Sequence, residues 1–124
     1  MSATILIADD EPNILLSLEF LMQREGFRVL VARDGQQALD AILAHQPDLV
    51  LLDVMMPIKN GFEVLQAVRE REDLAGLKVL MLTAKGREID MAKGLALGAS
   101  AYMTKPFSTR ELVDKVRSLL ESAA

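Results

Sequence analysis

The chain has 124 residues and 51% of them are hydrophobic, which excludes disorder and predicts a single domain over residues 1–124 with its own core. The formal net charge is −4 and the basic residues are scattered, so we expect no direct nucleic-acid binding. The chain has no cysteine, no apolar run near the ~20 residues of a membrane span and no signal-peptide pattern, so we expect a cytoplasmic protein without disulfides, zinc-binding thiolates or a membrane segment.

Five short apolar runs alternate with segments of helical period along the chain. In chain order, the runs are Thr4–Ala8, Arg28–Ala32, Leu49–Leu52, Lys78–Leu82 and Ala101–Thr104. Three of them are apolar at nearly every position, which indicates strands that are covered on both faces of a parallel sheet.

Each intervening segment carries an apolar stripe. The stripes are Ile14, Leu15, Leu18, Leu21 and Met22; Ala38, Leu39, Ile42 and Leu43; Phe62, Leu65 and Val68; a weaker one of Ala92 and Leu95; and Leu112, Val113, Val116, Leu119 and Leu120. This alternation predicts an α/β fold, (βα)5 and doubly wound, with helices on both faces of a five-stranded parallel sheet. All strand C-termini then lie at one edge, where such folds bind ligands.

Polar residues stand at the ends of four of the five runs. They are Asp9 and Asp10, Asp53, Thr83 and Lys105. Alternation alone does not set the strand order. In the flavodoxin-like order 2-1-3-4-5, neighbouring strands are ~4.8 Å apart, and Lys105 starts about 10 Å from Asp53, a gap its flexible stem can largely close. We predict this order because it brings all five residues to one point.

Three carboxylates so close together repel one another, and a hard cation would remove that cost. Mg²⁺ prefers oxygen ligands and commonly combines carboxylates with a phosphate oxygen. Lys105 adds a positive charge and Thr83 a hydroxyl donor for a phosphoryl group. The inventory predicts phosphoryl-transfer chemistry, which depends on positioning and charge neutralisation.

Four motifs in this order resemble the response-regulator receiver domains of two-component signalling, over Ile5 to about Leu120, and single-domain chemotaxis receivers in particular. They are Ile7–Ala8–Asp9–Asp10–Glu11, Asp53–Val54–Met55–Met56–Pro57 with Gly61, Thr83–Ala84, and Lys105–Pro106–Phe107. The resemblance implies a phosphorylation-activated switch rather than an enzyme with a separate substrate.

The resemblance also implies a role for each site residue. Asp53 would accept a phosphoryl group from a phosphohistidine on a histidine kinase or a histidine phosphotransfer protein. Mg²⁺ would be held by Asp10, Asp53 and the main-chain carbonyl of Met55, with Asp9 acting largely through water. Three groups would contact the phosphoryl oxygens: Lys105, Thr83 and the Ala84 amide.

Further implied features concern the signal output. The Lys105–Pro106 peptide bond would be cis. Tyr102 would be the aromatic switch that turns inward as Thr83 moves toward the phosphate. A downstream effector protein would bind the fifth strand and its flanking helices, Arg87–Leu97 and Ser108–Leu120. Bulky Met55 and Lys85 beside the site predict slow self-hydrolysis.

Two other functions use related residues. A phosphatase of the haloacid-dehalogenase type also combines a strand-end Asp, Mg²⁺, Thr and Lys, but it needs a second acid two residues after the nucleophile, where this chain has Met55. A flavin carrier of the same fold needs a hydroxyl-rich phosphate loop after the first strand, where this chain has three acids.

The chain is expected to be either a stand-alone receiver or an N-terminal piece of a DNA-binding transcriptional regulator. Receivers of winged-helix regulators dimerise through salt bridges on the output face. Here Met91 stands where those receivers usually have a basic residue, and Ser100 and Ala101 stand where they have an acidic pair. Glu111 and Lys115 are present but lack the expected partners. We therefore expect a monomer rather than that dimer.

Overall fold

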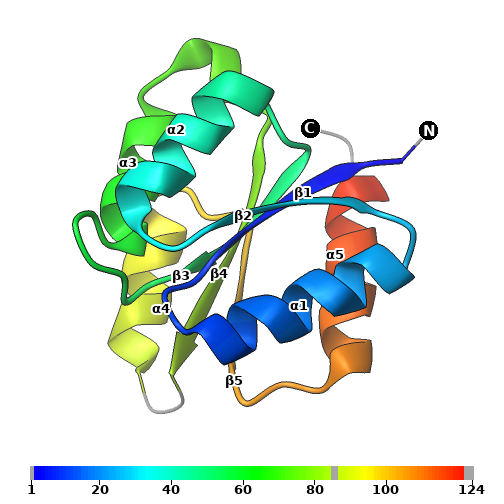
Figure 1. The fold of residues 1–124 in the computed structure, drawn as a ribbon. Coiled ribbons are helices and arrows are strands. Elements are labelled where there is room, and N and C mark those ends of the chain that lie inside the picture. Colours follow the sequence, from blue (N-terminus) through cyan, green and yellow to red (C-terminus); the bar gives the residue numbers. More distant parts are fainter. Residues whose placement is uncertain (1, 85–86, 122–124) are drawn as a thin grey trace.

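The computed structural model describes residues 2–84 and 87–121, in which strands and helices alternate along the chain (Figure 1). The strands are β1 (Thr4–Ala8), β2 (Arg28–Ala32), β3 (Leu49–Asp53), β4 (Lys78–Ala84) and β5 (Ala101–Lys105). The α-helices are α1 (Pro12–Arg24), α2 (Gly35–His45), α3 (Gly61–Arg69), α4 (Glu88–Ala96) and α5 (Thr109–Glu121), and a short 3-10 helix, η1, spans Glu72–Leu74. None of the helices in these ranges is long and apolar enough to span a bilayer.

The strands form one parallel sheet in the order β2-β1-β3-β4-β5, which confirms the predicted flavodoxin-like topology. The register aligns the strand ends: Ala8 pairs with Leu52, Asp53 with Leu82, and Ala84 with Lys105. The polar residues at the ends of four strands therefore lie at one edge of the sheet.

Two apolar layers hold the helices against the sheet because successive strand residues point to opposite faces. Helices α1 and α5 cover one face, where Leu18 and Leu112 pack with Ile5, Ile7 and other inward strand residues. Helices α2 and α3 cover the other face, and α4 lies beside them toward β5 (Figure 1). Each fully buried Leu or Ile contributes roughly 1.5–3 kcal/mol.

The central strands are more buried than the edge strands. Every residue of β3 is buried, as is nearly every residue of β1 and β4, whereas β2 and β5 are only partly covered. This pattern is the one expected for the apolar central runs, and it places Asp53 at the end of the most enclosed strand.

Two expectations need correction. Three strands extend one or two residues past the predicted runs, so Asp53, Thr83 and Lys105 are the last or next-to-last residues of β3, β4 and β5, at the strand ends where they were predicted. The predicted stripe of α4 is wrong, because Ala92 and Leu95 are exposed and the buried positions are Asp90 and Gly94. The packing is close at Gly94, where an added Cβ would lie 2.9 Å from the Tyr102 ring.

Candidate functional site

Three carboxylates from two neighbouring strands form an acid cluster at the sheet edge. Asp9 and Asp10 follow β1, and Asp53 ends β3. One carboxylate oxygen from each of the three lies within 4.8 Å of the others. Asp9 is fully buried, Asp53 is 7% exposed and Asp10 is exposed to solvent. Of the three acids, Asp10 is thus the one most accessible to solvent.

Asp9 is fixed by hydrogen bonds from both sides. Its Oδ1 accepts the backbone N–H of Glu11 at 2.9 Å, and its Oδ2 accepts the Lys105 ammonium at 3.0 Å. Burial of a carboxylate is costly without such partners. Asp9 therefore anchors the lysine to the cluster.

Lys105 crosses from β5 to reach the cluster as predicted, and its Nζ also lies 3.5 Å from Asp53 Oδ1. Burial lowers the pKa of this ammonium, but the hydrogen bond to Asp9 and the charge of Asp53 outweigh burial, so the pKa is raised. The Lys105–Pro106 peptide bond is cis, as the resemblance implies.

Burial and a neighbouring charge raise the pKa of Asp53. Burial raises its pKa from 3.8 to about 6, and the Asp9 charge adds to this effect, whereas Lys105 and the backbone N–H of Met55 lower it. A carboxylate whose proton affinity is raised by burial and by a neighbouring acid is poised to accept a cation or to react.

The loop between β3 and α3 lies against the cluster and is held by close backbone packing. A Cβ on Gly61 would overlap the Asp53 carbonyl, and one on Gly35 would overlap the Lys59 carbonyl. The side chain of Met55 projects outward from this loop and is 65% exposed. Its backbone is therefore held near Asp53 while its side chain meets solvent at the mouth of the site.

Thr83 and Ala84 close the edge on the β4 side. Thr83 is 2% exposed, and Ala84 is exposed and pairs with Lys105 in the sheet register. The Thr83 hydroxyl donates to Asp90 Oδ2 at 3.5 Å rather than to the acid cluster. Lys85, which we expected to shield the site together with Met55, lies outside the described residues.

A second polar group, the hydroxyl cluster, consists of Thr83, Arg87, Asp90 and Tyr102. Arg87 donates to Asp90 from Nε at 2.7 Å and from a terminal nitrogen at 3.2 Å. The Tyr102 hydroxyl is buried there beside Thr83, and within the described residues it forms no hydrogen bond of good geometry. Burial raises the pKa of this hydroxyl.

Sequence reasoning missed Arg87 and Asp90 as members of a polar cluster. The available signal was the weakness of the α4 stripe, combined with a charge pair at spacing i,i+3 in its first turn. Tyr102, in contrast, was named, and it lies with Thr83 in this cluster.

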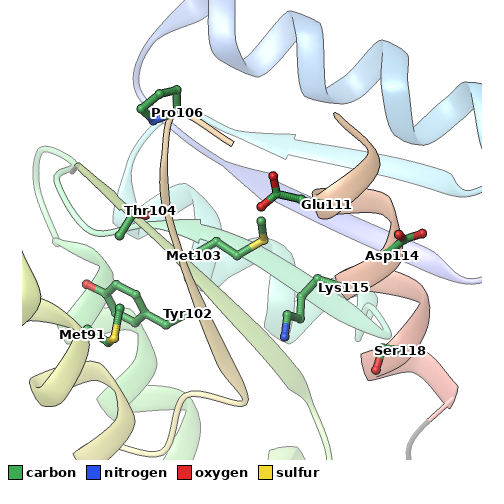
Figure 2. A pocket seen from close by; sticks show the side chains of 9 residues that line it. All are labelled: Met91, Tyr102, Met103, Thr104, Pro106, Glu111, Asp114, Lys115 and Ser118. Atoms are coloured by element: carbon green, nitrogen blue, oxygen red, sulfur yellow. The ribbon is translucent and has the colours of Figure 1, made fainter. Parts of the chain in front are cut away.

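A surface groove of about 540 Å³ runs beside Tyr102 between α4, β5 and α5. Figure 2 shows Met91 and the Tyr102 ring at one side and the side chains of Glu111, Lys115 and Ser118 projecting from α5 at the other. Tyr102 thus belongs both to the lining of this groove and to the hydroxyl cluster.

Taken together, the acid cluster and Lys105 can hold a hard divalent cation and a phosphoryl group side by side. The carboxylates offer the oxygen ligands that Mg²⁺ prefers. The Lys105 ammonium lies within contact distance of Asp53 and can neutralise phosphoryl oxygens there. The geometry thus fits phosphoryl chemistry at a carboxylate.

Comparisons with known proteins point the same way. The family model of the response regulator receiver domain matches residues 5–117. A protein described as a response regulator from Chloroflexus aurantiacus is 34% identical, with a TM-score of 0.94 over 98% of this chain and 100% of that chain.

Two further structures are similar. The chemotaxis response regulator CheY4 of Vibrio cholerae is 30% identical, with a TM-score of 0.90 over 96% of this chain and 99% of that chain. NtrX from Brucella abortus is 28% identical, with a TM-score of 0.90 over 98% of this chain but only 27% of that chain. The order of the strands, the arrangement of the acid cluster and these matches lead to one conclusion: the chain belongs to the response regulator receiver domain family.

Proposed function

We propose that residues 1–124 form a single receiver domain that is switched by phosphorylation of Asp53. Phosphorylation switching is general in this family. The observation that carries the proposal for this chain is the Lys105 ammonium, which lies 3.0 Å from Asp9 and 3.5 Å from Asp53 at an edge where three carboxylates converge.

In the proposed reaction, Asp53 is the nucleophile and the donor is a phosphohistidine on a histidine kinase or a histidine phosphotransfer protein. A carboxylate oxygen of Asp53 forms an O–P bond as the N–P bond to the partner's histidine breaks. Lys105 neutralises charge on the phosphoryl oxygens from its position beside Asp53, and the Thr83 hydroxyl and the Ala84 amide are the further donors. Charge neutralisation of this kind is the main part of phosphoryl-transfer catalysis.

The residues present also fit a resident Mg²⁺. Receiver domains bind this ion at an acidic pocket, and three carboxylate oxygens within 4.8 Å of one another form such a pocket here. Asp10, Asp53 and the Met55 carbonyl would hold the ion, and Asp9 would contribute largely through water. When bound, it supplies positive charge that offsets the repulsion among the acids and the incoming phosphoryl oxygens.

The groove beside Tyr102 is the proposed site of the downstream effector protein. Tyr102 both lines this groove and belongs to the hydroxyl cluster with Thr83. A phosphoryl group that recruits Thr83 changes the surroundings of Tyr102 and shifts the population of conformers that the effector binds. Thr83 and Tyr102 are thus the proposed switch pair.

The protein acts, in this proposal, as a cytoplasmic monomer that catalyses only its own phosphorylation and slow dephosphorylation. Exposed Met55 supports the slow step because a bulky apolar side chain at the mouth of the site limits the approach of water. The alternative arrangement is the N-terminal receiver of a longer DNA-binding regulator. Analytical ultracentrifugation of the phosphorylated chain distinguishes a monomer from an output-face dimer.

The function is tested by intact-mass spectrometry after incubation with Mg²⁺ and acetyl phosphate. We expect one phosphoryl addition to the wild-type protein, and none in Asp53→Asn or when EDTA removes the metal. An addition that persists in Asp53→Asn would place the acceptor elsewhere. Turnover of a small phosphomonoester in the same assay would favour the phosphatase class instead.

A further inference from the structure

Helix α4 buries a carboxylate that the proposed phosphoryl chemistry does not use. Asp90 is 6% exposed, and of the α4 residues whose burial the structure describes only Asp90 and Gly94 are buried. A helix normally turns apolar side chains toward the sheet. A charge in that position therefore requires an explanation.

Arg87 makes the burial tolerable. It contacts both oxygens of Asp90, and this hydrogen bonding holds the pKa of the Asp90 carboxyl below its usual range. Asp90 is thus charged at neutral pH and remains a strong acceptor. The Arg87 side chain is 52% exposed, so solvent shares its charge.

The remaining contact of this carboxylate is with Thr83. The Thr83 hydroxyl donates to Asp90 Oδ2 at 3.5 Å, across the interface between β4 and α4. A threonine hydroxyl has one proton and can donate it to one acceptor at a time. Donation to Asp90 and donation to a phosphoryl oxygen on Asp53 therefore exclude each other.

We infer that Asp90, with Arg87, is a positioning residue that holds the Thr83 hydroxyl away from the phosphoryl site, and so sets how readily the site accepts a phosphoryl group. The inference rests on the proposed function. The length of the Thr83–Asp90 contact makes it a weak hydrogen bond, one that a phosphoryl oxygen can outcompete.

The simpler reading is that Asp90 only stabilises the positive N-terminal end of α4, in whose first turn it lies. The two readings predict different responses to mutation. A role in stabilising the helix alone gives no reason for removal of Asp90 to strengthen binding at the phosphoryl site. A positioning role predicts opposite changes in that binding: removal of Asp90 frees the Thr83 hydroxyl and strengthens it, whereas removal of Arg87 leaves a carboxylate with a stronger need for the Thr83 proton and weakens it.

The test titrates beryllofluoride, a stable analogue of a phosphoryl group, into the chain with excess Mg²⁺. Binding is followed by ¹⁹F NMR of the bound species. The chain has one tyrosine and no tryptophan, so its fluorescence reports on Tyr102 in parallel. We expect Asp90→Ala to bind beryllofluoride roughly two- to tenfold more tightly than wild type, the range for losing one competing hydrogen bond. Arg87→Ala should bind more weakly.

Two controls separate positioning from folding. In a Thr83→Ala background, Asp90→Ala should leave the affinity unchanged, because the competing hydroxyl is already absent. Asp90→Asn keeps the volume of the side chain and should shift the affinity in the same direction as Asp90→Ala by a smaller factor. This variant keeps the test decisive if the alanine variant does not fold.

Weaker binding by both Asp90→Ala and Arg87→Ala, or an Asp90 effect that survives in the Thr83→Ala background, would overturn the inference. Unchanged affinity in the Asp90 variants would do the same while leaving the proposed function intact. A wild-type protein that binds no beryllofluoride would overturn the proposed function, and the inference with it.

Discussion

The acid cluster and the hydroxyl cluster lie at the same edge of the sheet but are held in different ways. Lys105, which neutralises the acid cluster, is 96 residues from Asp9 in the sequence, and the nearby loop is packed backbone against backbone. The hydroxyl cluster is neutralised by Arg87, only three residues from Asp90, and includes a long hydrogen bond and an unpartnered hydroxyl. The acid cluster is therefore rigid and suited to binding a cation and a phosphoryl group, whereas the hydroxyl cluster can rearrange at a small cost in free energy.

The largest expected effect follows from removing the charge that ties the acid cluster together. Lys105→Met should slow phosphorylation by acetyl phosphate about 10²–10³-fold, the usual cost of losing one group that stabilises transition-state charge. Time-resolved intact-mass spectrometry measures the rate. Arg110→Met, which removes an exposed charge at the start of α5, is the control and should be unaffected. A loss below about threefold in Lys105→Met would show that the ammonium does not contact the reacting group.

The acid cluster should also make the free energy of unfolding depend on pH. The pKa of Asp53 is raised from 3.8 to about 6 in the folded protein. The charged carboxylate therefore destabilises the folded state, fully above about pH 6, less as the pH falls, and not at all below the pKa of the unfolded chain. Without Mg²⁺, Asp53→Asn should therefore be about 1–3 kcal/mol more stable than wild type near neutral pH.

This advantage should shrink as the pH falls from 6 toward 4, where the wild-type carboxyl is protonated. Urea unfolding of both proteins across this range gives the difference. A constant difference at every pH, or a less stable Asp53→Asn at neutral pH, would contradict the assigned burial and repulsion.

Two glycine substitutions compare the rigidity of the clusters directly. A Cβ on Gly35 would overlap the Lys59 backbone, so Gly35→Ala should lower the free energy of unfolding by about 1–3 kcal/mol. A Cβ on Gly94 would meet the Tyr102 ring, which can rotate, and helix propensity favours alanine by about 1 kcal/mol.

Gly94→Ala should therefore change stability by less than about 1 kcal/mol while altering the fluorescence of Tyr102. Urea unfolding and tyrosine emission provide the two readouts. Equal losses of stability in the two variants would remove the proposed difference in rigidity between the clusters.

The smallest expected effect concerns the unpartnered hydroxyl. Tyr102→Phe removes a buried donor that has no partner, so it should leave the free energy of unfolding unchanged or raise it by up to about 1 kcal/mol. Thermal and urea unfolding measure the change. A loss of more than about 1 kcal/mol would mean that the hydroxyl is hydrogen-bonded in solution.

The fold and the acid cluster could be predicted from the sequence because each depends on short local patterns. The buried runs define the central strands, and a parallel sheet brings residues at their ends to one edge whatever lies between. The strand order did not follow from these runs; it was predicted because it brings Asp9, Asp10, Asp53 and Lys105 together, and the sheet has that order.

The hydroxyl cluster could not be predicted in the same way. Periodicity identifies apolar faces, and it assigned Ala92 and Leu95 to the buried side of α4, whereas the helix turns Asp90 and Gly94 inward. The contact between Thr83 and Asp90 and the close approach of Gly94 to Tyr102 depend on how α4 lies against β4 and β5. The position of α4 on the sheet is set by tertiary packing, which the pattern of a single segment does not reveal.

The most direct measurement is a crystal structure of the protein with Mg²⁺ and beryllofluoride. The account predicts beryllium on a carboxylate oxygen of Asp53, Mg²⁺ on Asp10, Asp53 and the Met55 carbonyl, and the Thr83 hydroxyl turned from Asp90 to a fluoride. Beryllofluoride bound away from Asp53, or a metal held without Asp10 and Asp53, would contradict the central claim.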